Sequence, residues 1–80
     1  MVEVIFDAYF KNKFKKIKDK TLKLKIIKQI QKIKENPEAG KPMMYGRKGT
    51  REMYIAPFRL SYKSEENAIY ILDLYHKDEQ

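Results

Sequence analysis

The residues best suited to chemistry in this chain are three cations in its last third. Arg51, Arg59 and Lys77 stand among β-branched and aromatic residues, in stretches typical of short strands. Every arginine of the chain falls within residues 47–59, and the remaining cations are lysines and one histidine. A guanidinium binds phosphate as a planar fork, whereas an ammonium binds it as a point charge. The segregation of arginine therefore indicates a phosphate-binding site.

Alternation along the strand around Arg59 predicts which way its side chain points. Successive side chains of a strand point to opposite faces of the sheet. If Leu60 and Tyr62 face the core, the side chains of Arg59 and Lys63 point to the opposite face of the sheet. Arg59 is thus expected on an exposed face, within reach of a ligand.

The last strand is expected to bring further groups to that face. Its more apolar alternating set is Tyr70, Leu72 and Leu74, which leaves the opposite face to Asp73, Tyr75 and Lys77. Arg59 and Lys77 can then converge, as a phosphate site requires. The alternative is purely structural, with Arg59 paired to Asp73 across the strands.

His76 has an unperturbed pKa of about 6.5, which suits proton transfer. Strict alternation nevertheless places it on the core side with Leu74, so a structural histidine is the alternative. It is the only histidine, and the chain has no cysteine. A zinc-type metal site is therefore not expected, and no cofactor is predicted.

Length and composition predict a single domain over residues 1–80. The lack of cysteine excludes disulfides and favours a reducing cytoplasm. The apolar run from Met1 ends at Asp7, too early for a signal peptide. No apolar stretch approaches the roughly 20 residues that cross a bilayer, so no membrane association is predicted.

The formal charge of +7 favours polyanionic partners. Lys41, Arg47 and Lys48 form a basic segment suited to RNA contacts, and a solvated turn is the alternative. Lys63 lies on the predicted face of Arg59 and is a further candidate for RNA contact. Tyr75 is the tyrosine best placed to stack on a base, although strand aromatics more often pack in the core.

The elements that must position these groups are readable from periodicity. We expect a first strand over Val2–Phe6, followed by two amphipathic helices. The apolar stripe of the first helix is Phe6, Phe10, Phe14 and Ile17. The apolar stripe of the second helix is Leu22, Ile26, Ile27, Ile30 and Ile33. Asp19 or Thr21 caps the second helix, which should end near Asn36 because Pro37 disfavours helix before it. The two helices are expected to form an antiparallel hairpin.

After Gly40 the period changes to that of strands. We expect strands over Met43–Tyr45, Arg51–Ala56, Arg59–Lys63 and Ala68–Tyr75, with a polar turn at Ser64–Asn67. Strand, helix hairpin and about four mainly antiparallel strands indicate an α+β fold, with the helices covering one face of the sheet.

This element order resembles the RelE/ParE superfamily of toxins, the toxin halves of type II toxin–antitoxin systems, and is most similar to its RelE branch. The likeness covers nearly the whole chain. It rests on Gly49-x-Arg51-Glu52, on Phe58-Arg59-Leu60-x-Tyr62 and on a long apolar strand ending in His76-Lys77. The resemblance implies the same RelE-like fold.

RelE-type members cleave messenger RNA in the ribosomal A site, and ParE-type members poison gyrase. The resemblance implies a metal-independent endoribonuclease that inhibits translation and arrests growth. In that reaction the 2′-hydroxyl attacks the adjacent phosphate, which requires a cation, a base and an acid. The implied partners are the ribosome, messenger RNA and a RelB-like antitoxin. The antitoxin is expected to be acidic and partly disordered, to fold on binding, and to form a hetero-oligomer with the toxin.

The resemblance also assigns residues. Arg59 matches the family arginine that stabilises transition-state charge, and Lys77 stands where many relatives carry an arginine. Arg51 matches a basic position of the preceding strand. His76 matches a histidine just before the terminal basic residue.

Two departures keep other functions open. The tyrosine that many active members carry beyond the terminal basic residue is missing before Gln80, and Met53 and Ile55 replace basic residues of the best-known nucleases. One alternative is a ParE-like binding protein that inhibits gyrase without chemistry. Another is a degenerate toxin that only holds its antitoxin.

Overall fold

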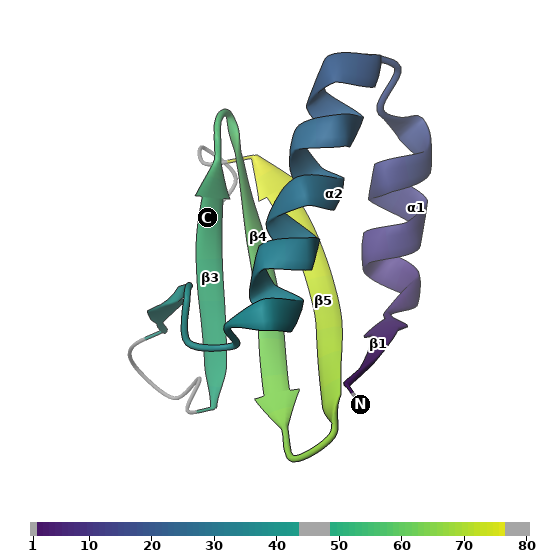
Figure 1. The fold of residues 1–80 in the computed structure, drawn as a ribbon. Coiled ribbons are helices and arrows are strands. Elements are labelled where there is room, and N and C mark those ends of the chain that lie inside the picture. The colour runs from purple at the N-terminus through teal and green to yellow at the C-terminus, as the bar shows by residue number, and fades with distance from the viewer. Residues whose placement is uncertain (1, 44–48, 77–80) are drawn as a thin grey trace.

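A mixed five-stranded sheet with two helices against it makes up the computed structural model, which describes residues 2–43 and 49–76. In chain order the elements are β1 (Glu3–Phe6), α1 (Ala8–Lys16), α2 (Lys20–Glu35), β2 (Lys41–Pro42), β3 (Thr50–Ile55), β4 (Phe58–Glu65) and β5 (Ala68–His76). The strand order is β1-β5-β4-β3-β2 (Figure 1). β1 runs parallel to β5, and the other neighbours are antiparallel. The predicted α+β fold is confirmed, with one strand pair parallel.

Both helices begin at an aspartate. The Asp7 side chain accepts a hydrogen bond from the Tyr9 N–H at 2.9 Å and caps α1. Of the two predicted caps of α2, Asp19 is the one used, because it accepts from the N–H groups of Thr21 and Leu22. α2 ends with Asn36 as its C-cap, as Pro37 predicts.

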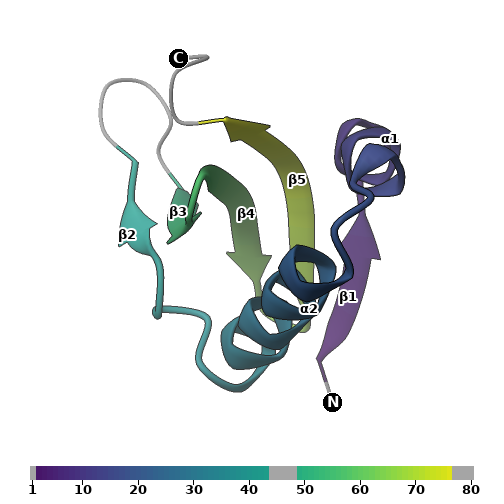
Figure 2. The same cartoon turned by 90° about the horizontal axis from the view of Figure 1, so that it is seen from above.

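One apolar core joins the helices to the sheet. α2 crosses in front of the central strands, and α1 lies beside β5 and β1 (Figures 1 and 2). The buried residues of this core are Phe10, Ile26, Ile33, Ile55, Leu60, Tyr62, Ile69, Ile71 and Leu74. Ile27, predicted on the buried stripe of α2, is instead exposed.

Strand β5 does not alternate strictly, so one prediction for it was wrong. Ile69 and Ile71 are buried, whereas Tyr70 and Leu72 are only partly buried. The register jumps here, since Ser61 pairs with Asp73 and Tyr62 with Ile71, leaving Leu72 as the extra residue of a bulge. A bulge shifts the alternation by one residue. Beyond it, the predicted inward position of Leu74 is correct.

The described part of the chain adds a short strand, β2 at Lys41–Pro42, just before the strand expected at Met43–Tyr45. The Met43 N–H donates to the Thr50 carbonyl at 3.0 Å, and the rest of that expected strand lies outside the described residues. β4 continues through Glu65, which shortens the turn predicted at Ser64–Asn67. No helix within the described ranges is long and apolar enough to cross a membrane.

Candidate functional site

A row of three side chains crosses the sheet on the face opposite the core. Arg59 on β4 pairs with Tyr54 on β3 and with Tyr75 on β5. Directly opposed residues of neighbouring strands share a face. The neighbouring row of Leu60 and Leu74 is buried, so Arg59 points away from the core, as strand alternation predicts.

Glu52 connects two members of this row. Its Oε1 accepts a hydrogen bond from the Arg59 Nη1 at 2.6 Å, and its Oε2 accepts one from the Tyr75 hydroxyl at 2.7 Å. The Arg59 and Glu52 side chains are 34% and 20% exposed. Both are therefore partly buried, yet a ligand in solution can still contact them. We call Glu52, Arg59 and Tyr75 the Arg59 cluster.

The Arg59 guanidinium is held from two sides and still has donors left. Its carbon lies 5.9 Å from the centre of the Tyr54 ring, a cation–π distance. Its Nε is buried and has no hydrogen-bond partner within residues 2–43 and 49–76. Since a guanidinium carries five N–H donors in a fixed fork and the Arg59 side chain is 34% exposed, donors other than the buried Nε can still bind an acceptor such as a phosphate oxygen.

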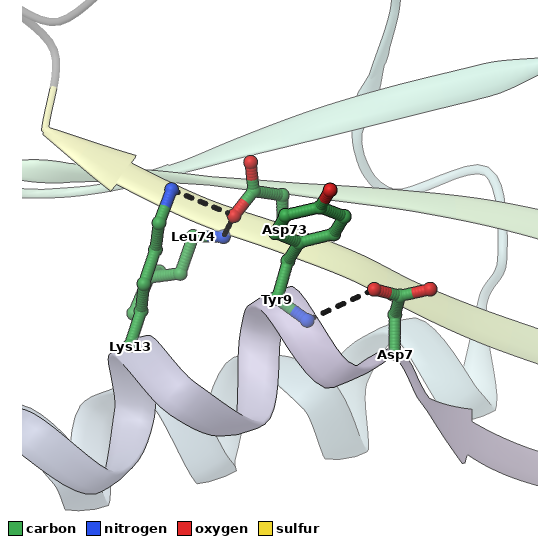
Figure 3. A network of polar contacts seen from close by, with 5 residues as sticks. All are labelled: Asp7, Tyr9, Lys13, Asp73 and Leu74. Carbon is green, nitrogen blue, oxygen red and sulfur yellow. Dashed lines mark hydrogen bonds and ion pairs between the residues drawn. The ribbon is translucent and has the colours of Figure 1, made fainter.

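Asp73 takes no part in the Arg59 cluster. The structural alternative for Arg59 was a pair with Asp73, but Asp73 accepts instead from the Lys13 ammonium of α1 at 2.9 Å. Figure 3 shows Lys13 reaching from α1 to Asp73, which also accepts from the Leu74 N–H. Asp73 therefore ties α1 to β5, and Glu52 is the carboxylate that Arg59 contacts.

Arg51 lies on the other face of the sheet, where it pairs with Tyr62. Its Nη1 donates to the Gly40 carbonyl at 2.8 Å and to the Glu38 carbonyl at 3.4 Å. These contacts fasten the segment after α2 to β3. The structure therefore separates Arg51 from Arg59, although the sequence places both in strands of one predicted site.

Tyr62 completes this fastening from within the core. Its hydroxyl accepts from the Gly40 N–H and donates to the Pro37 carbonyl, both at 2.8 Å. Burial raises the pKa of Tyr62, while the Gly40 hydrogen bond and the Arg51 charge act in the opposite direction. Arg51 and Tyr62 thus position the entry to β2 and β3.

The remaining predicted site residues are scattered. His76 pairs with Phe58, and its ring meets the Phe58 ring edge-on at 5.7 Å, on the side of the core as alternation predicts. The Lys63 ammonium contacts Glu65 at 3.0 Å, and Lys41 is exposed on β2. Lys77, Arg47 and Lys48 lie outside the described residues.

Sequence reasoning quoted Glu52 in a motif but gave it no role. The signal was present, because Glu52 precedes Tyr54 by two residues and therefore shares its face. In an antiparallel pair, Glu52 is also the diagonal neighbour of Arg59, which long side chains can reach. Neither relation is visible before the register of β3 and β4 is known.

The comparison with protein families decides the identity of this scaffold. A model described as the ParE toxin of the type II toxin–antitoxin system, parDE, matches residues 4–80. The chain belongs to this toxin family. The resemblance to the RelE/ParE superfamily is thereby confirmed, and no curated protein matches the chain in sequence.

Solved structures of toxins share the fold of this ParE-family chain. A YoeB/ParE toxin from Agrobacterium tumefaciens has a TM-score of 0.83 at 18% identity, covering 94% of this chain and 98% of its own. A YoeB dimer from Staphylococcus aureus has a TM-score of 0.82 at 20% identity, covering 94% of this chain and 95% of its own. The intact E. coli RelBE toxin–antitoxin complex has a TM-score of 0.81 at 14% identity, covering 95% of this chain and 96% of its own. At these identities the likeness establishes the fold.

Proposed function

We propose that this toxin is a ribosome-dependent endoribonuclease that cleaves messenger RNA and thereby inhibits translation. One observation carries the proposal: the Glu52 carboxylate accepts hydrogen bonds from both Arg59 and Tyr75 on the exposed face of the sheet. The Arg59 cluster therefore holds a cation, a carboxylate and a phenol within hydrogen-bond distance. These are the groups that attack of a 2′-hydroxyl on phosphate requires.

In the proposed reaction the ribose 2′-oxygen forms a bond to the adjacent phosphorus, and the bond from phosphorus to the 5′-oxygen breaks. The products are a 2′,3′-cyclic phosphate and a free 5′-hydroxyl. Arg59 stabilises the negative charge that develops on the phosphate oxygens. A fixed donor of this kind contributes about 10²–10³ in rate.

The proton path uses the two partners of Glu52 in turn. Glu52 takes the proton of the 2′-hydroxyl, and Tyr75 gives its proton to the leaving 5′-oxygen. Protonated Glu52 then returns a proton to Tyr75 across their 2.7 Å contact. The net change moves one proton from the 2′-oxygen to the 5′-oxygen and restores the cluster.

Two earlier candidates take other parts in this proposal. His76 contacts Phe58 on the core side, so Tyr75 replaces it as the acid. Arg51 holds the segment at Gly40 through a carbonyl and supports the scaffold of the site. Lys77 remains a proposed catalytic cation, and Lys41, Arg47, Lys48 and Lys63 remain proposed contacts to RNA.

The proposed cellular partner is an acidic, partly disordered antitoxin that folds on binding and inhibits the toxin in the cytoplasm. The formal charge of +7 supports an acidic partner. The E. coli relative was solved as a toxin–antitoxin complex. A toxin–antitoxin hetero-oligomer follows from this proposal.

A second candidate function is inhibition of gyrase by binding, without chemistry. The observation that favours it is the ParE description of the family model that matches the chain. Under this function Glu52 would simply neutralise Arg59. Induction of DNA breaks with messenger RNA left intact distinguishes it from nuclease activity.

The proposal is tested by primer extension on a reporter message in a translating extract. Wild-type protein should give codon-phased cuts that require ribosomes, and Arg59→Ala should lower cutting at least about 100-fold because the transition-state cation is gone. Lys25→Ala, which removes an exposed lysine of α2, is the matched control and should cut normally. An intact message with wild-type protein contradicts the proposal and leads to the gyrase assay. A toxin that binds an antitoxin yet arrests nothing would indicate the degenerate alternative.

A further inference from the structure

Tyr54 is the aromatic residue of the Arg59 row that is open to solvent. It is 55% exposed and pairs directly with Arg59, one residue before β3 ends at the hairpin to β4. Tyr75, on the other side of Arg59, has its hydroxyl bound to Glu52. Aromatic residues in strands usually bury their rings against neighbours. An aromatic ring exposed beside a phosphate-binding arginine is therefore suited to a ligand.

We infer that Tyr54 stacks on a base of the single-stranded RNA, next to the phosphate held by Arg59. This inference rests on the proposed function and adds a residue that selects the substrate. Base and phosphate of one nucleotide are joined through a single ribose, so a phosphate at Arg59 places its base within reach of the adjacent strand. The guanidinium carbon lies 5.9 Å from the Tyr54 ring centre. One face of the ring thus meets the cation, and the exposed part is available to a base.

The chemistry of this pair fits single-stranded RNA rather than a duplex. Unpaired bases are recognised by stacking on aromatic side chains while cations hold the backbone. Arg59 and Tyr54 supply these two contacts from neighbouring strands. Glu52, which flanks them, disfavours a second phosphate close to the first, so one nucleotide is bound at a defined position.

The test uses a short 2′-O-methyl RNA, which cannot undergo attack by a 2′-hydroxyl, with one fluorescent 2-aminopurine base. Binding to wild-type protein should quench the fluorescence, because stacking on an aromatic ring quenches this base. Tyr54→Phe should preserve quenching and affinity. Tyr54→Leu should abolish quenching and weaken binding roughly tenfold, within the range measured for base–aromatic stacking. The matched control is Tyr9→Leu, which removes a tyrosine that is 71% exposed on α1 and should behave as wild type.

A second RNA, with the base at the reporter position deleted, separates stacking from a structural role of Tyr54. Wild type and Tyr54→Leu should bind this abasic RNA equally. If Tyr54→Leu weakens binding of both RNAs alike, or quenches as wild type does, Tyr54 does not stack on a base. Absence of quenching with wild-type protein also overturns the inference.

Failure of the inference and failure of the proposed function give different results. A message cut by wild type, with no dependence of quenching on Tyr54, overturns the stacking and leaves the nuclease proposal standing. Quenching that depends on Tyr54, together with a message that stays intact, supports base stacking by Tyr54 and contradicts the nuclease proposal.

Discussion

Glu52 is the residue that gives the exposed sheet face its chemical character. A carboxylate repels phosphate, so its presence beside Arg59 would be costly at a site that only binds RNA. Its two hydrogen bonds, to Arg59 and to Tyr75, compensate for this charge and orient all three groups. In the proposed nuclease reaction, Glu52 acts as the base and also orients Arg59 and Tyr75 through these two hydrogen bonds.

Glu52→Gln tests this role directly. The amide keeps an acceptor for Arg59 or Tyr75 but cannot take a proton, so cleavage should fall by about 10²–10⁴-fold, the contribution of a positioned base. Single-turnover cleavage on programmed ribosomes measures the effect. Glu65→Gln, which removes the carboxylate that contacts Lys63, serves as control and should leave the rate unchanged. Normal cleavage by Glu52→Gln would exclude Glu52 as the base.

Tyr62 is the residue whose hydroxyl should matter for stability. Tyr62→Phe leaves the Gly40 N–H without its acceptor inside the protein and removes the bond to the Pro37 carbonyl. We expect the free energy of unfolding to fall by about 1–3 kcal/mol, measured by urea denaturation at pH 8. An unchanged denaturation midpoint would mean that water replaces the hydroxyl at no cost.

The Tyr62 hydroxyl should also make the free energy of unfolding depend on pH, and Tyr62→Phe is the reference protein for this effect. Burial raises the pKa of Tyr62 above its usual value of 10.0, so the folded protein keeps a proton that the unfolded chain loses. Stability from this group is therefore full below about pH 10 and declines as the pH rises further. The stability difference between wild type and Tyr62→Phe should stay constant up to about pH 10 and shrink as the pH rises above it. Lysine titration affects both proteins and cancels in the difference.

At the scale of elements, the connection from α2 to β2 and β3 carries the main packing constraint. A Cβ atom at Gly40 would lie 2.7 Å from the Tyr62 ring and 2.8 Å from the Glu52 carbonyl oxygen. Gly40→Ala should therefore force this segment away from the sheet and destabilise the protein by about 1–3 kcal/mol, as overpacking does. Thermal unfolding measures this loss of stability. The control is Ala39→Gly, a change at the adjacent exposed position. A Gly40→Ala protein as stable as wild type would contradict the close packing.

Local sequence patterns predict most elements because helices and strands follow local periodicity. The Phe10–Phe14 stripe, the Asp19 cap and the stop before Pro37 all depend on residues close in sequence. The β5 bulge does not, since one extra residue at Leu72 shifts the inward set and nothing in the local pattern marks it. Contacts between distant segments were missed for the same reason. Arg51 meets Gly40, and Glu52 meets Tyr75, only after the sheet has formed.

At the scale of the whole molecule, charge and chemistry occupy different surfaces. The formal charge of +7 comes mainly from lysines of the two helices, and such a field attracts RNA without regard to sequence. The Arg59 cluster lies on the sheet face opposite the core that the helices cover. In the proposed function, the surface that attracts RNA and the site that cleaves it are thus separate, and the proposed acidic antitoxin can oppose the attraction while it covers the site.

The most direct test of the proposed nuclease activity is the chemistry of the cut ends of a message from a purified translation system. Attack by the 2′-hydroxyl, with Arg59, Glu52 and Tyr75 in the proposed roles, leaves a 2′,3′-cyclic phosphate upstream and a 5′-hydroxyl downstream. Ends of this kind, formed only with ribosomes and wild-type toxin, are the predicted result. A message that stays intact, or fragments that carry a 5′-phosphate, would contradict it.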